Sequence, residues 1–167
     1  MCIRDSFYPF RIRPAATRMP LVIVLSAVLF NVVNAGLNGY YLATHADDYG
    51  ADWLRTPHFW IGLALFAAGA YVNLRSDAML IALRSESDRG YRIPRGFLFE
   101  HVSSPNLLGE IIEWAGFAVM AWNLPALSFF VWTCANLLPR ARNHHDWYRE
   151  RFPDYPPERK AVIPLLY

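Results

Sequence analysis

Two carboxylates stand in a segment that otherwise has the composition of a membrane helix. Glu110 and Glu113 interrupt the run NLLGEIIEWAGFAVMAW, which begins at Asn106. A charge inside a bilayer costs at least ~2.5–3.5 kcal/mol, so such residues face a protein interior, a wet cavity or a ligand. Asn106, Glu110 and Glu113 are spaced i, i+4 and i+7 and therefore share one face of a helix. This face is the strongest indication of a functional site in the chain.

Two more helical faces of polar side chains flank this one: Asn73, Asp77 and Arg84 on the first, and Arg140, His144 and Tyr148 on the second. At ~100° per residue the first three lie within about 40° of one another, and the second three are spaced i, i+4 and i+8. We call the three groups the Asn73 face, the Asn106 face and the Arg140 face. The loop from Tyr91 to Gly96 connects the first two.

The residue types on these faces fit a dinucleotide phosphate. Arginine binds phosphate through paired hydrogen bonds, carboxylates bind ribose hydroxyls, and asparagine pairs with a carboxamide. The arginines between Arg75 and Arg95 have a second explanation, because basic loops also fix the orientation of membrane proteins. Residue types alone leave both explanations of the basic loop open.

Other kinds of site lack their signatures. The chain has no G-x-G-x-x-G after a strand, no P-loop and no G-x-S-x-G nucleophile turn. His144 and His145 are adjacent and point apart on a helix, which argues against a multi-histidine metal site. The two cysteines, Cys2 and Cys134, give no disulfide framework. We expect no bound metal and no nucleic-acid partner.

The overall composition is that of a membrane protein. The chain is 54% hydrophobic and only 18% charged, whereas soluble domains are about 25% charged. Uncharged stretches of ~17–25 residues are candidates for membrane spans. We predict an all-α, polytopic helical bundle with four spans, at Met19–Ala43, Pro57–Leu74, Pro105–Asn123 and Pro125–Leu138. Two alternatives are one broken span from Leu107 to Leu138 and an unusually apolar soluble helical protein.

Local signals predict helix ends and helix contacts. Ser104 is expected as the N-cap and Pro105 as the first helical residue of the third span. The sequence from Asn123 to Pro125 breaks the helix, and the fourth span is expected to continue past Arg140 as a projecting cytoplasmic helix. The second span carries small residues that allow close helix approach, namely Gly62, Ala64, Ala67, Ala68 and Gly69.

The distribution of basic residues predicts the orientation. Arginine and lysine cluster before the first span, after the second and after the fourth, whereas only Arg55 lies between the first and second. By the positive-inside rule both termini and the middle loop are cytoplasmic, so the third and fourth spans form a hairpin. We expect an integral, multi-pass protein of the endoplasmic reticulum in a eukaryote or of the inner membrane in a bacterium.

The run from Gly90 to Trp114, GYRIPRGFLFEHVSSPNLLGEIIEW, resembles the steroid 5α-reductase family, the 3-oxo-5α-steroid 4-dehydrogenases. The resemblance continues through NLPAL at 123–127, PRARNHHDWY at 139–148 and the tail FPDYPPERKAVIPLLY at 152–167. Upstream, NLRSD at 73–77 and NGYY at 38–41 also look like family positions. These separate motifs occur in the right order and cover most of residues 7–167.

The resemblance implies a seven-helix membrane reductase. Such an enzyme delivers a hydride from NADPH to the β-carbon of an enone, a 3-oxo-Δ4 steroid, while an acid polarises the carbonyl. By matching motif positions, the cofactor-binding residues would be Asn73, Asp77, Arg84, Tyr91, Asn106, Glu110, Arg140, His144 and Tyr148. Glu113 has the alternative role of a hydrogen bond between helices.

The chain departs from the family pattern at two places. The family has further N-terminal helices, which supply the Glu and Tyr that bind and polarise the steroid ketone, so the catalytic residues cannot be named in this chain. The usual three-histidine run appears as Asn143-His144-His145. We interpret residues 1–6 as a non-native or assembly-derived start. Residues 7–167 are then an N-terminally truncated reductase domain with about four of the seven helices.

Three alternative functions stay open. The first is reduction of another enone, such as a trans-2-enoyl-CoA. The second is a prenylcysteine-type methyltransferase that binds S-adenosylmethionine, although the paired glutamates expected near its tail are absent. The third is an inactive truncated membrane fragment. We expect the partners to be a steroid or similar lipophilic enone and membrane lipid, and the protein to be a monomer.

Overall fold

The computed structural model of the chain describes residues 21–45, 49–86 and 92–167, apart from the side chains at positions 23, 27 and 84–86. These residues form α-helices α2 (Leu21–Thr44), α3 (Pro57–Glu86), α4 (Pro105–Ala121) and α5 (Leu124–Arg151), and the 3-10 helices η2 (Trp53–Arg55) and η3 (Phe97–Glu100). No β-strand occurs in the described part, and the prediction of an all-α fold is confirmed. The predictions for residues 1–6 and for Tyr91 lie outside the described residues.

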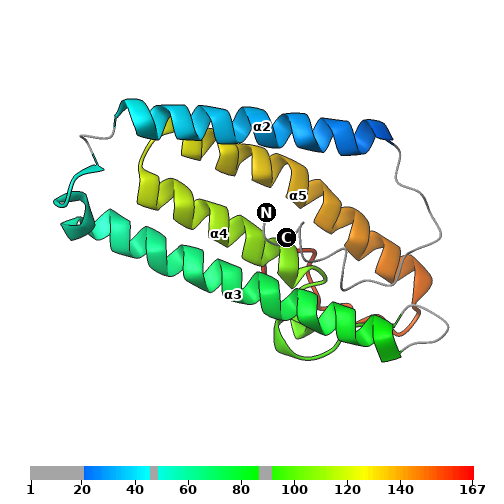
Figure 1. Ribbon diagram of the computed structural model, residues 1–167. Helices are drawn as coiled ribbons and strands as arrows, with labels where there is room; N and C mark the ends of the chain where they lie inside the picture. Colours follow the sequence, from blue (N-terminus) through cyan, green and yellow to red (C-terminus); the bar gives the residue numbers. More distant parts are fainter. Residues whose placement is uncertain (1–20, 46–48, 87–91) are drawn as a thin grey trace.

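The four α-helices that the structure describes follow one another in the order α2, α5, α4 and α3, and we call this row of helices the layer (Figure 1). α4 packs between α3 and α5, and α2 lies along the outer side of α5. Both α3 and α5 run antiparallel to α4, so α4 and α5 form the predicted hairpin rather than one broken span. The C-terminal end of α3, the N-terminal end of α4 and the C-terminal half of α5 therefore lie at one end of the layer, and these segments carry the three polar faces.

Two helices are longer than the spans predicted for them. α3 continues beyond Leu74 to Glu86, because residues 70–89 contain neither glycine nor proline and include many good helix formers. α5 continues through Pro139 to Arg151, as the prediction of a projecting helix required. The Asn73 face thus belongs to the same continuous helix as the second predicted span.

Glycines set the close contact between α3 and α4. A Cβ atom added at Gly62, Gly69, Gly109 or Gly116 would lie less than 3.0 Å from backbone atoms of the opposite helix. The two glycines on each helix are seven residues apart and so share one face. The prediction of close approach at Gly62 and Gly69 is confirmed, whereas the alanines predicted to join them, Ala64, Ala67 and Ala68, are exposed.

The turn between α4 and α5 is held by side chains from the α2–α3 connection. Trp122 ends α4 in the left-handed conformation at φ 48°, and the Asn123 side chain caps α5 by accepting a hydrogen bond from Ala126 N at 2.9 Å. Asn123 Nδ2 also donates to Tyr49 Oη, and Tyr49 Oη donates to Ala121 O, both at 2.8 Å. The predicted break at Asn123 is confirmed. At the other end of α4, Ser104 occupies the N-cap position as predicted, but its side chain makes no capping bond.

Replacing Asn123 by alanine should lower the free energy of unfolding by more than about 1 kcal/mol, which is the usual cost of losing an N-cap. The loss should be larger than for a cap alone, because the bond to Tyr49 disappears as well. Thermal unfolding in detergent would measure it, with Asn143→Ala as the control, since Asn143 lies exposed in the middle of α5. Equal melting temperatures for the two variants would contradict the role of Asn123.

One described helix, in the segment Pro57–Leu83, is long and apolar enough to cross a membrane by length and composition. Only 17% of its apolar window is buried, whereas the core helix of a soluble protein is mostly buried. α2 also exposes large apolar side chains, including 70% of Leu21, 75% of Val22 and 65% of Val32. Such surfaces are expected of helices that face lipid. The four-span topology stays a prediction.

Candidate functional site

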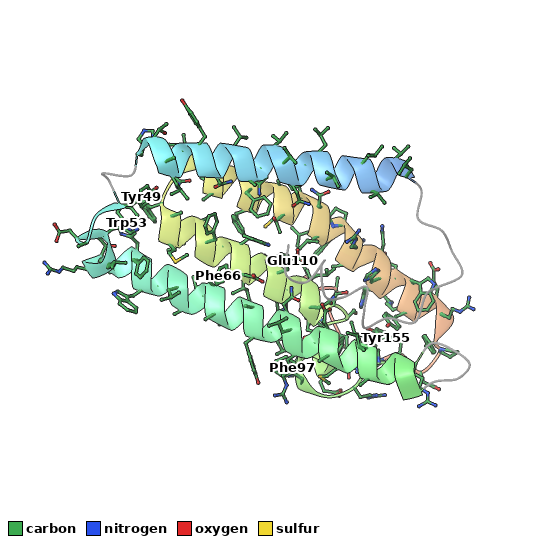
Figure 2. The ribbon with its side chains drawn as sticks, viewed as in Figure 1. Tyr49, Trp53, Phe66, Phe97, Glu110 and Tyr155 are labelled. Carbon is green, nitrogen blue, oxygen red and sulfur yellow. The ribbon has the colours of Figure 1, made fainter. Side chains whose placement is uncertain are left out.

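The Asn73 face and the Asn106 face meet between α3 and α4. Asn106 Nδ2 donates a hydrogen bond to Asp77 Oδ1 at 3.2 Å. Asn73, Asp77 and Glu110 are each less than a tenth exposed, and Figure 2 shows Glu110 on α4 within the layer. The close approach of Gly109 to the backbone of Asn73 explains why the two faces can touch. The structure thus brings together four predicted cofactor-binding residues.

Two buried polar atoms beside this contact lack a hydrogen-bond partner among the described residues. They are Oδ1 of Asn73 and the hydroxyl of Ser76, which is completely buried. A buried polar group without a partner costs about 1–3 kcal/mol, so such atoms are places where a ligand or ordered water is expected. Sequence reasoning missed Ser76. Its position beside Asp77 in the motif NLRSD was the available signal.

The Arg140 face lies at the same end of the layer. Leu107 of α4 packs against Leu137 and Ala141 of α5, so the first turn of α4 contacts the helix that carries this face. Arg140 and His144 are exposed on α5. The Arg140 face therefore belongs to the helix that packs beside the start of α4, at the end of the layer that holds the other two faces.

The chemistry of the Arg140 face is that of a cation beside a neutral ring. Although the His144 ring keeps solvent access, the protein atoms around it and the charge of Arg140 together lower its pKa. His144 is therefore mainly neutral at pH 7. Tyr148, half-buried, stacks on Phe152 and Tyr155, with ring centroids 6.0 Å and 5.5 Å apart. An arginine, an imidazole and a phenol together can bind a phosphate group by charge and hydrogen bonding.

Three predicted residues are placed less fully. Arg84 belongs to α3, but its side chain is not described, and Tyr91 lies outside the described residues. Glu113 is half-buried, and its backbone is where α4 most closely approaches Gly69 of α3. In the part of the chain that the structure describes, no group of three His, Cys, Asp or Glu residues could hold a metal ion.

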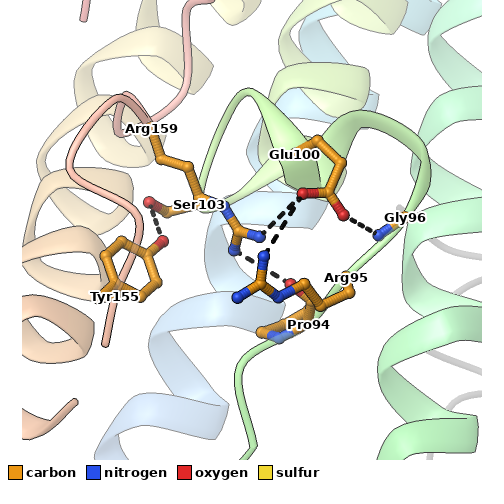
Figure 3. A network of polar contacts seen from close by, with 7 residues as sticks. All are labelled: Pro94, Arg95, Gly96, Glu100, Ser103, Tyr155 and Arg159. Carbon is orange, nitrogen blue, oxygen red and sulfur yellow. Dashed lines mark hydrogen bonds and ion pairs between the residues drawn. The ribbon is translucent and has the colours of Figure 1, made fainter. Parts of the chain in front are cut away.

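The tail after α5 is anchored by a buried arginine (Figure 3). Arg159 Nη1 donates to Pro94 O at 3.0 Å, and Nη2 lies 3.4 Å from Glu100 Oε2. The N–H of Gly96 donates to Glu100 Oε1 at 2.5 Å. This bond and, to a smaller extent, the charge of Arg159 lower the pKa of Glu100. The tail is thereby joined to the loop that leads into α4.

Comparison with known proteins gives consistent matches. The family model described as 3-oxo-5-alpha-steroid 4-dehydrogenase matches residues 17–167. Steroid 5-alpha-reductase DET2 of Solanum lycopersicum is 46% identical over an alignment of 167 residues, which covers 98% of this chain and 64% of that protein. 3-Oxo-5-alpha-steroid 4-dehydrogenase 1 is 43% identical in Bos taurus and 41% in Homo sapiens, over 98% of this chain and 63% and 62% of those proteins. The chain thus spans less than two thirds of the length of these relatives.

Proposed function

Because the chain belongs to the 3-oxo-5-alpha-steroid 4-dehydrogenase family, a family of membrane proteins, we propose that the protein is an NADPH-dependent reductase of 3-oxo-Δ4 steroids. The observation that carries the proposal is the hydrogen bond between Asn106 and Asp77 beside the buried Glu110. The bond joins an amide of α4 to a carboxylate of α3 in a largely apolar layer, and the second carboxylate, Glu110, lies one turn further along α4. Polar groups at such a depth suit a ligand rich in hydroxyl and amide groups.

The residues on the three faces fit NADPH by their chemistry. When bound, NADPH would supply the hydride for reduction of the C4–C5 double bond. Asn106 and Glu110 would hold the nicotinamide end, and the orphaned Oδ1 of Asn73 offers an acceptor to a carboxamide or hydroxyl. Arg84 and Arg140 would neutralise phosphate charge. The remaining proposed cofactor-binding residues are Asp77, Tyr91, His144 and Tyr148.

The protein's own contribution is orientation and exclusion of water. A hydride donor must be held ~3–3.5 Å from the acceptor carbon in a dry pocket. A rigid glycine contact between α3 and α4 suits this task, because it fixes the two helices that carry the buried polar residues. The acid that polarises the steroid ketone is not assigned to a residue of this chain.

The membrane would supply the substrate, since steroids dissolve in lipid. We propose a multi-pass protein with cytoplasmic termini, because basic residues concentrate in the segments that would then face the cytoplasm. The three polar faces would lie at the cytoplasmic end, which is where a water-soluble dinucleotide is available. The steroid would reach the site from the lipid around the helices. We propose that the protein acts there as a monomer.

Replacing Glu110 by glutamine should weaken NADPH binding by about 10-fold or more, because a hydrogen bond to a charged group contributes about 1.5–3 kcal/mol. The substitution keeps the shape of the side chain and removes its charge. Nicotinamide fluorescence of the protein in lipid nanodiscs would measure the dissociation constant. Glu150→Gln is the matched control, because Glu150 is exposed on α5.

The possible results test two hypotheses separately: that Glu110 binds NADPH, and that the protein binds NADPH at all. If Glu110→Gln binds NADPH as tightly as Glu150→Gln does, Glu110 has no part in the site. If the unaltered protein does not bind NADPH at all, the proposed function itself is wrong for this chain. If the unaltered protein does bind NADPH, consumption of a 3-oxo-Δ4 steroid, compared with that of a trans-2-enoyl-CoA, decides between the steroid and another enone as substrate.

A further inference from the structure

A hydrogen-bonded junction outside the three polar faces joins three segments that are distant in the sequence. Ser103 Oγ, just before α4, lies 2.6 Å from His145 Nδ1 of α5 and 2.6 Å from Tyr155 Oη of the tail. The same oxygen lies 3.1 Å from the carbonyl oxygen of Lys160. Ser103 and Tyr155 are both buried. We call Ser103, His145 and Tyr155 the serine junction.

One arrangement of protons satisfies every member of the serine junction. A carbonyl oxygen only accepts, so the Ser103 hydroxyl donates to Lys160 O. The two lone pairs of Ser103 Oγ then accept from the Tyr155 hydroxyl and from His145 Nδ1–H. This arrangement uses the full hydrogen-bonding capacity of the serine and assigns the proton of the neutral imidazole to Nδ1.

The surroundings of the junction keep the imidazole neutral and in place. Partial burial, followed by the positive charge of Arg149, lowers the pKa of His145, and the carboxylate of Asp146 only partly opposes them. The His145 ring also meets the Tyr155 ring edge-on, with centroids 5.9 Å apart. A neutral His145 needs no counter-ion and can act through its single Nδ1–H donor.

The junction lies next to two of the polar faces. Ser103 stands three residues before Asn106, and its backbone N–H donates to Lys160 O at 2.8 Å. The next residue, Ser104, donates to Ala161 O at 3.2 Å, so the segment that starts α4 is bonded to the tail. His145 immediately follows His144 on α5. A displacement at the junction would therefore shift the Asn106 face relative to the Arg140 face.

We propose that His145 is a positioning residue, which acts through Ser103 and Tyr155 to hold the start of α4 against α5 and so keeps the Asn106 and Arg140 faces in register for NADPH. This inference rests on the proposed function, because the register matters only if both faces bind the same ligand. His145 itself need not touch the cofactor. Its single donor atom, Nδ1, is the feature that matters.

A pair of substitutions tests the role of that atom. The side chain of asparagine can place an N–H where Nδ1 lies, whereas that of glutamine reaches toward Nε2. His145→Asn should therefore bind NADPH within about twofold of the unaltered protein, and His145→Gln should bind about tenfold more weakly. Ser103→Ala should weaken binding to a similar degree, and the double variant with His145→Gln should be little worse than either single variant.

A second measurement does not depend on NADPH. Hydrogen exchange at the amides of Ser104, Leu107 and Leu108 should become faster in His145→Gln and stay unchanged in His145→Asn. Equal exchange in both variants, or equal loss of NADPH affinity in both, would overturn the proposal. If the unaltered protein binds no NADPH, the proposed function fails, while the exchange data still decide whether His145 positions α4.

Discussion

Replacing Gly109 by alanine is expected to destabilise the contact between α3 and α4, whereas the same replacement at Gly36 is expected to leave the protein folded. An added Cβ at Gly109 would lie 2.7 Å from Gly69 O and 2.9 Å from the Cα of Asn73. These are backbone atoms, which cannot rotate away as a side chain would. The helices must therefore move apart, and overpacking of this kind costs about 1–3 kcal/mol.

Gly36 is a matched control because a Cβ there meets nothing within 4 Å. Alanine at such a helical position should even stabilise the helix by up to about 1 kcal/mol. Thermal unfolding in detergent would give both values. Gly109→Ala should also weaken NADPH binding, since Asn73 is the residue displaced. Similar melting temperatures for the two variants would show that the glycine contact is not as close as described.

Helical periodicity was enough to predict the polar pairs on α3 and α4. Asn73 and Asp77, like Asn106 and Glu110, are one turn apart, and this local spacing holds in any helix. The bond from Asn106 to Asp77 was not predictable in detail, because it depends on how two helices pack across a loop. The sequence therefore predicted which side chains share a face but not the atoms that meet.

The small residues of α3 predicted the helix–helix contact less accurately than the polar residues predicted the polar faces. Gly62 and Gly69 face α4, whereas Ala67, two residues before Gly69, is exposed. The sequence of α3 alone could not distinguish the small residues that face α4 from those that are exposed, because that depends on where α4 packs. The partner glycines Gly109 and Gly116 had the same spacing of seven residues, which was the available signal.

The long-range contacts of the tail could not be predicted from local sequence patterns. Ser103 and His145 are separated by 42 positions in the chain, and neither spacing nor composition connects them. Arg159 was counted among the basic residues that orient the protein in the membrane, yet its side chain is completely buried. A basic residue at a membrane surface and one buried in a folded tail have the same appearance in a sequence.

Replacing Arg159 by lysine is expected to release the C-terminal tail almost as fully as replacing it by methionine. The guanidinium bonds Pro94 O and Glu100 at once and lies 5.3 Å from the centre of the Tyr155 ring. A lysine ammonium cannot reproduce this planar, forked geometry, and it is more costly to bury. Each variant should lower the free energy of unfolding by about 2–3 kcal/mol, in the range for broken buried hydrogen-bond networks.

The exposed Arg151 provides the control, because Arg151→Lys at the surface should change stability by no more than about 0.5 kcal/mol. Limited proteolysis of the tail, together with thermal unfolding, would separate local release from global unfolding. Release should expose sites between Phe152 and Tyr167 before α5 unfolds, since α5 also packs on α4 through Leu137. A tail as protected in Arg159→Lys as in the unaltered protein would mean that charge alone, and not the forked geometry of arginine, holds the tail to the loop before α4.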